Sequence, residues 1–148
     1  MNAPPQLTVL LIEDHDDSRE AIKGWLEWKG YRVFTANDKQ SGLALALTQS
    51  IDLLICDLQL PDGNGWELME KVKAAKPVCG IITSGHCSAA DIARSKAVGY
   101  LEHLVKPYPV EELDAWLTRV RKQLKKQDGG SVLDKGCVED RDQGSPGN

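Results

Sequence analysis

The sequence has no apolar run long enough to cross a membrane and no signal-peptide pattern at its start. Its apolar runs fall far short of the ~18 residues that a membrane span needs, and the first residues, MNAPPQ, form neither a basic nor an apolar region. An excess of positive charge is also missing, since the formal net charge is -4 and the pI is about 5.4. We therefore expect a cytoplasmic protein that binds neither a membrane nor nucleic acid directly.

Two kinds of ligand site are missing as well. The four cysteines form no CxxC pair, which argues against a zinc site and against a redox dithiol. No GxGxxG or GxxxxGK pattern follows the first apolar run, which argues against nucleotide-binding α/β proteins.

Short apolar runs alternate with segments of helical periodicity. The chain has 148 residues, of which 41% are hydrophobic and 27% are charged, and this suits one folded domain. The strand-like runs are Thr8–Ile12, Tyr31–Ala36, Leu53–Cys56, Val78–Thr83 and a short run within Tyr100–Val105. Each connection is long enough for a right-handed βαβ unit. The sequence thus predicts a three-layer α/β fold, in which a five-stranded parallel sheet is covered by helices on both faces.

Local signals divide the chain and mark the helices. We expect residues 1–6 to be a lead, residues 7–127 to be the folded domain and residues 128–148 to be a polar, disordered tail. Asp17 or Ser18 is predicted to cap the first helix, and Asn37 is a candidate cap for the second. Trp28 and Trp66 could contact a partner, but we favour core or partial burial for each.

Charged and hydroxyl side chains follow four of the five predicted strands. They are Glu13 and Asp14 after the first strand, Asp57 after the third, Thr83 and Ser84 after the fourth, and Lys106 after the fifth. The carboxyl ends of parallel strands share one edge, so these groups should face one another. Asp57 alone could simply end a strand, and Lys106 alone could be a solvated loop lysine, but neither explanation covers the whole set.

These residue types suit phosphoryl chemistry. Carboxylates that lie close together repel one another, and a magnesium ion relieves that repulsion while it leaves positions for phosphate oxygens. If Asp57 is the nucleophile, the metal, the Ser84 hydroxyl and the Lys106 ammonium could each hold one oxygen of the transferred group.

Four motifs extend this pattern over most of the chain. They are LLIEDH at Leu10–His15, DLQLPDGNG at Asp57–Gly65, TSGH at Thr83–His86 and LVKPY at Leu104–Tyr108. In this order they resemble the receiver domain of two-component response regulators, from Leu7 to about Gln127. The resemblance implies a flavodoxin-like fold with strand order 2-1-3-4-5.

The resemblance also implies a role for each acidic position. Asp57 would be the phosphoacceptor, which takes a phosphoryl group from a histidine kinase or a phosphotransfer protein. Magnesium would be bound by Asp14, by Asp57 and by the backbone carbonyl of Gln59. Glu13, which stands where Asp is more frequent, would act on the metal mostly through water.

Ser84 and Lys106 would respond to the phosphoryl group. The resemblance makes Ser84 the switch hydroxyl and Lys106 the salt-bridge partner, and it implies a cis peptide bond before Pro107. His103 stands where the family usually has Tyr or Phe, so the familiar inward rotation of an aromatic ring on activation is in question at this switch position.

Phosphorylation is expected to change the surface formed by the fourth helix, the fifth strand and the fifth helix, which would then contact a downstream protein partner of unknown identity. The protein would not be a turnover enzyme, although it would assist its own phosphorylation and dephosphorylation at Asp57. The residues leave the oligomeric state open, a homodimer included. They also leave open whether this is a free-standing receiver or the receiver of a larger protein.

Three other functions compete with this one. A receiver-like module that binds partners without phosphorylation is the main alternative. An aspartyl-phosphate phosphatase would resemble a DxDxT pattern, but Leu58 and Gln59 follow Asp57, so no acid stands two positions on. A flavin site is disfavoured because the acids after the first strand would repel the cofactor phosphate.

Overall fold

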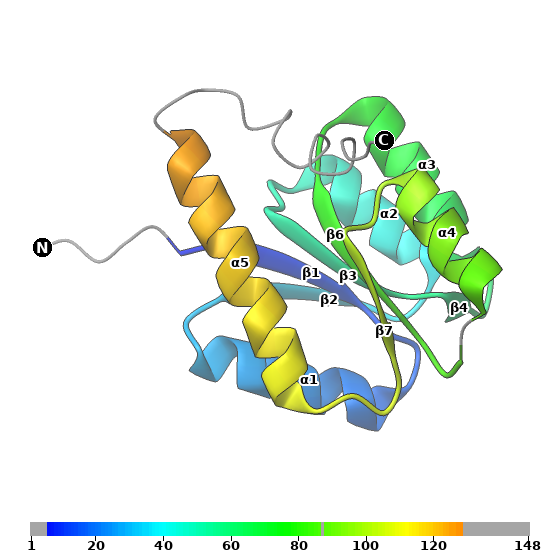
Figure 1. Cartoon of the computed structure of the whole chain (residues 1–148), viewed down its shortest axis with the longest axis horizontal. Helices are drawn as coiled ribbons and strands as arrows, with labels where there is room; N and C mark the ends of the chain where they lie inside the picture. Colours follow the sequence, from blue (N-terminus) through cyan, green and yellow to red (C-terminus); the bar gives the residue numbers. More distant parts are fainter. Residues whose placement is uncertain (1–5, 87, 129–148) are drawn as a thin grey trace, which may run out of the picture.

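The computed structural model describes residues 6–86 and 88–128 (Figure 1). Its helices and strands, in chain order, are β1 (Thr8–Ile12), α1 (Asp16–Trp28), β2 (Arg32–Ala36), α2 (Lys39–Thr48), β3 (Leu53–Asp57), β4 (Gln59–Leu60), β5 (Gly63–Asn64), α3 (Gly65–Ala75), β6 (Cys79–Ser84), α4 (Ala89–Val98), β7 (Glu102–Val105) and α5 (Val110–Asp128). The expected lead and tail fall almost entirely outside the described residues.

The main sheet has five parallel strands in the order β2-β1-β3-β6-β7. Counted along this sheet alone, that order is 2-1-3-4-5, so the predicted fold class and strand order are confirmed. In the described part of the chain, no helix is both long and apolar enough to cross a membrane.

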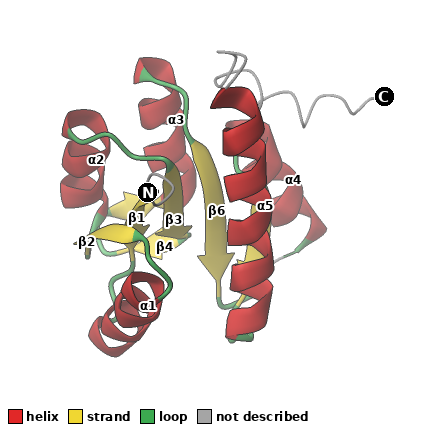
Figure 2. Ribbon diagram, turned by 90° about the vertical axis from the view of Figure 1, so that its left-hand side faces the viewer, coloured by secondary structure: helices red, strands yellow, loops and turns green. Residues whose placement is uncertain are grey.

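The sheet separates two apolar cores. Successive residues of a strand point to opposite faces, so Leu10 and Ile12 of β1 pack into one core while Val9 and Leu11 pack into the other. The first core holds side chains of α2 and α3, and the second holds side chains of α1 and α5. The two views show the helices on both sides of the sheet (Figures 1 and 2). The strands are thus buried on both faces, as short uninterrupted apolar runs predict.

The turn-rich segment after β3 has more structure than a surface loop. Strands β4 and β5 form a small antiparallel ribbon, in which Gln59 pairs with Asn64. At its tip, the Asp62 carboxylate accepts hydrogen bonds from the backbone N–H groups of Lys39 (2.6 Å) and Gln40 (2.9 Å) at the start of α2. The ribbon is therefore tied to a helix that precedes it by more than twenty residues.

Three local predictions about helices were wrong. Helix α1 begins at Asp16, one residue before the first predicted cap, and its N-cap His15 makes no side-chain cap. The cap of α2 is Asp38, whose carboxylate accepts from the Ser41 N–H, and not Asn37. Trp28 was expected to be at least partly buried, but it is 79% exposed. The buried residue of α1 is Leu26, and residues two positions apart do not lie on the same face of a helix.

The α2 cap gives a matched pair of test variants. Asp38→Ala removes the acceptor for the Ser41 N–H, so we expect it to lower the free energy of unfolding by about 1 kcal/mol. Asn37→Ala, at the exposed neighbouring position, should change it by less than about 0.5 kcal/mol. Urea denaturation followed by circular dichroism measures both, and equal losses would show that Asp38 is not the cap.

Candidate functional site

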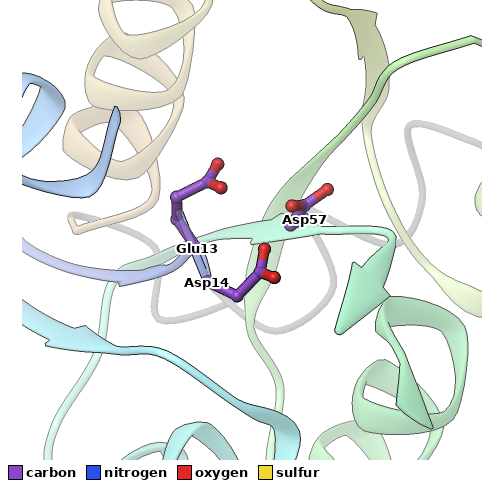
Figure 3. Close-up of side chains that lie close together, drawn as sticks. All are labelled: Glu13, Asp14 and Asp57. Atoms are coloured by element: carbon purple, nitrogen blue, oxygen red, sulfur yellow. The ribbon is translucent and has the colours of Figure 1, made fainter. Parts of the chain in front are cut away.

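Three carboxylates gather at the carboxyl edge of the sheet. Glu13 and Asp14 follow β1 directly, and Asp57 is the last residue of β3, the strand beside it. One oxygen of each lies within 4.8 Å of one oxygen of the others (Figure 3). Glu13 and Asp57 are only 2% and 8% exposed, whereas Asp14 is open to solvent. The cluster therefore has two buried carboxylates and one that solvent can reach.

Lys106 connects two of these acids. Its Nζ lies 2.7 Å from Oε1 of Glu13 and 3.2 Å from Oδ2 of Asp57. The Lys106 backbone N–H also donates to the carbonyl of Ser84 (2.7 Å), which fixes the start of the loop after β7 against the end of β6. The Lys106–Pro107 peptide bond is cis, as expected.

Glu13 is held by more than this ion pair. Its second oxygen, Oε2, accepts from the backbone N–H of His15 (3.1 Å), and its own carbonyl accepts from Nη1 of Arg19 (3.0 Å). Both carboxylate oxygens thus have a partner within the chain. Sequence reasoning placed Glu13 at the metal and did not foresee its contact with Lys106.

Crowding changes the proton affinity of the central acid. Burial raises the pKa of Asp57 to about 6, with Glu13 and Asp14 acting in the same direction and Lys106 against it. The pKa of Lys106 is also raised, because its contacts with Glu13 and Asp57 outweigh its own burial. A positive charge near Asp57 is therefore already part of the site, and a second one would be favourable.

The donor set fits a hard divalent cation. Carboxylate oxygens are the ligands that magnesium prefers, and it usually binds one or two of them and keeps several waters. Asp14 and Asp57 can supply such oxygens, and the exposure of Asp14 leaves room for water. Gln59, whose backbone carbonyl was predicted to be a ligand, is an exposed residue of β4, two positions beyond Asp57.

The predicted switch residues are buried and bonded to each other. Ser84 Oγ lies 2.7 Å from Nε2 of His103 and donates to the backbone carbonyl of His86 (2.7 Å). Nδ1 of His103 lies 3.0 Å from Oγ of Ser95, which accepts from the indole N–H of Trp66 (2.9 Å). The His103 ring is 6% exposed and lies between the hydroxyls of Ser84 and Ser95.

The contacts of Ser95 with His103 and Trp66 were not predicted from the sequence. Ser95 lies in α4 between charged and small residues, and no local pattern distinguishes it from a solvent-facing serine. Trp66 was expected to be at least partly buried, which is confirmed, but its hydrogen-bond partner was not foreseen. Both contacts join different helices and strands.

A pocket of about 480 Å³ opens beside Lys106 and Glu13. It lies between α1 and the start of α5, and the rest of its lining is mostly apolar: Ser18, Ala21, Ile22, Trp25, Pro107, Tyr108, Val110 and Leu113. The carboxylate cluster thus borders a hollow that could receive a partner side chain or helix.

Known proteins resemble this chain in sequence. The model of the response regulator receiver domain matches residues 9–118. The transcriptional regulatory protein HprR of Escherichia coli K12 is 34% identical over 119 residues, which is 80% of this chain and 52% of HprR. The KDP operon transcriptional regulatory protein KdpE of the same organism is 34% identical over 126 residues, or 85% of this chain and 55% of KdpE. The chain spans about half the length of these curated relatives.

Solved structures agree in fold. The non-phosphorylated HemR receiver domain from Leptospira biflexa superposes with a TM-score of 0.74 at 30% identity, covering 78% of this chain and 94% of that domain. A CheY-like receiver domain protein from Methanospirillum hungatei gives 0.75 at 27% identity, covering 85% and 99%. With its strand order and its acidic edge, this chain belongs to the response regulator receiver domain family of two-component systems.

Proposed function

We propose that this protein is a phosphoacceptor in a two-component phosphorelay and that Asp57 receives the phosphoryl group. The observation that carries the proposal is the contact of one ammonium, that of Lys106, with both Glu13 and Asp57 at the edge where three carboxylates meet. A binding module without phosphoryl chemistry would have no need of this crowded and electrostatically unfavourable arrangement.

In the proposed reaction, a carboxylate oxygen of Asp57 attacks the phosphorus of a phosphohistidine on a histidine kinase or phosphotransfer protein. The P–O bond forms as the P–N bond breaks, and the donor imidazole leaves with the electron pair of that bond. Magnesium, held by Asp14, Asp57 and the Gln59 carbonyl, would neutralise the charge on the phosphoryl oxygens. Glu13, whose two oxygens already have partners, would reach the ion mainly through water.

Lys106 and Ser84 would then hold the product. The new group adds roughly -1.5 to -2 charge next to Asp57 and brings acceptor oxygens only. The ammonium of Lys106 can pair with one of these oxygens, and the Ser84 hydroxyl can turn its proton from the His86 carbonyl to another. The protein would assist this transfer and its own dephosphorylation, and it would not turn over a free substrate.

The output would be a changed protein contact in the cytoplasm. We propose that the surface of α4, β7 and α5 responds and contacts a downstream protein or a second copy of the chain. The negative net charge argues against direct contact with nucleic acid. The longer relatives HprR and KdpE are named as transcriptional regulatory proteins, and that activity belongs to them as whole proteins.

Phosphorylation can be tested with a small donor. Incubation with acetyl phosphate and magnesium should add the mass of one phosphoryl group to the intact protein, and Asp57→Ala should show no gain. Omission of magnesium should reduce the adduct strongly. A short lifetime must be excluded by rapid acid quenching, and an unmodified protein after that control would favour the phosphorylation-independent binding module.

The raised pKa of Asp57 predicts how the stability of the metal-free protein changes with pH. The pKa of Asp57 is raised from 3.8 to about 6 in the folded state, so its contribution to stability is most favourable below about pH 4 and declines as the pH rises through 6. At about pH 7.5, Asp57→Asn should therefore raise the melting temperature by a few degrees. Magnesium should raise the melting temperature of the unmodified protein, and it should have little effect on the melting temperature of Asp57→Asn.

The control for this test is Asp17→Asn, which removes the same charge from an exposed position of α1 outside the cluster. It should leave both the melting temperature and the response to magnesium nearly unchanged. Equal responses of the two variants would show that net charge, and not the cluster, sets the effect.

The pocket beside Lys106 suggests where the phosphodonor protein docks. It is mostly apolar, it opens next to the acid cluster, and Val110 on its lining is 40% exposed. An apolar helix of the donor could fill it and bring a phosphohistidine to Asp57.

Docking can be separated from chemistry with two donors. Val110→Asp should slow transfer from a phosphorylated histidine phosphotransfer protein at least several-fold and leave phosphorylation by acetyl phosphate unchanged. Leu47→Asp, at an exposed leucine of α2, is the matched control and should affect neither reaction. Equal slowing of both donors by Val110→Asp would indicate damage to the site itself.

A further inference from the structure

A chain of hydrogen bonds starts at the Ser84 hydroxyl, one residue beyond Thr83, which pairs with Asp57 across β6 and β3. It passes from Ser84 through His103 of β7 and Ser95 of α4 to Trp66 of α3. Ser95 has no exposed surface, and His103 is 6% exposed. At the far end, the guanidinium of Arg94 lies 4.1 Å from the centre of the Trp66 ring. These hydrogen bonds therefore connect Ser84, at the end of β6, to the neighbouring helices α3 and α4 (Figure 1).

The donors in this chain all point the same way. The Ser84 hydroxyl has one proton and donates it to the His86 carbonyl, so its bond with His103 must be donated by Nε2–H of the imidazole. The indole N–H of Trp66 can only donate, and it donates to Ser95 Oγ. In a neutral imidazole, Nδ1 then accepts the Ser95 proton. The direction is Trp66 to Ser95 to His103 to Ser84.

The burial of His103 favours the neutral imidazole that this direction needs, and Ser95 is buried as well. Burial lowers the pKa of His103 below its ordinary value, and the charge of Asp91 opposes this effect without reversing it, so the neutral ring is favoured near pH 7. Ser95 is also the buried residue of α4. Its hydroxyl thus forms a polar contact between α4 and both β7 and α3, beside the partly buried Val98.

We propose that Ser95 and His103 are positioning residues that transmit the state of the Ser84 hydroxyl to Trp66 and Arg94, so that the α3–α4 surface responds to the phosphoacceptor site without rotation of the His103 ring. The proposal rests on the phosphorylation of Asp57 only because that step would start the change at Ser84. When Ser84 turns its proton toward a phosphoryl oxygen, it still accepts from His103, and every bond of the chain is polarised in one direction. Movement of Ser84 toward Asp57 then draws His103 and Ser95 with it.

The indole N–H of Trp66 reports on this coupling in ¹H–¹⁵N spectra, where Trp66→Phe assigns its resonance. In the unphosphorylated protein, Ser84→Ala should shift the resonance, and the same change made in a Ser95→Ala background should not shift it further. Thr118→Ala, which removes an exposed helix hydroxyl outside the chain, should leave it in place. If the chemical shift of the Trp66 indole N–H is the same in Ser84→Ala as in the unmodified protein, the proposal is overturned.

Phosphorylation gives the second arm. With acetyl phosphate and magnesium, the Trp66 resonance should move in proportion to the mass adduct, and Ser95→Ala should abolish this response while the adduct still forms. An adduct that moves Trp66 equally in both proteins would refute the coupling. Absence of any adduct would refute the proposed function instead, and the Ser84→Ala comparison would still decide the coupling.

The unmodified protein offers a test that needs no variant to fold. The ¹⁵N shifts of the His103 ring should show a protonated Nε2 and an unprotonated Nδ1 near pH 7. The opposite tautomer would reverse the direction of the chain and overturn the proposal.

Discussion

The chemistry of the site depends on the repulsion between three carboxylates that the sheet brings to one edge. Two of them are nearly buried, and the ammonium of Lys106 is the positive group in contact with both. Burial raises the pKa of Asp57, and the neighbouring Glu13 and Asp14 add to this effect, although Lys106 opposes it. The excess of negative charge favours a cation at this edge, and a bound cation would in turn offset the negative charge of a phosphoryl group.

The two sides of this edge are built differently. Toward β1, both carboxylate oxygens of Glu13 are held, one by Lys106 and the other by the backbone of His15. Toward β6 and β7, Ser84 and His103 belong to a chain of neutral hydrogen bonds that extends to α4. A helix fixed through such bonds can shift when one donor changes its acceptor, whereas a helix fixed by a broad apolar face resists small movements.

Much of the fold was predictable because its signals are local. Uninterrupted apolar runs indicate strands buried on both faces, and the strand bounds agree with the prediction to within about two residues. The ribbon of β4 and β5 was not predicted, since two-residue strands have no periodicity to detect. The α2 cap was misplaced by one residue because Asn37 and Asp38 are both good caps, and only the backbone path decides which side chain reaches Ser41.

By itself the sequence determined the parallel α/β fold, the set of groups at the strand ends and the family, because each depends on apolar periodicity and on motifs read along the chain. The tertiary structure alone decided how those groups are paired. Lys106 meets Glu13 across 93 positions of sequence, and Ser84 meets His103 across 19. Such contacts follow from strand register and helix packing, and these arise from the whole core together and not from any one segment.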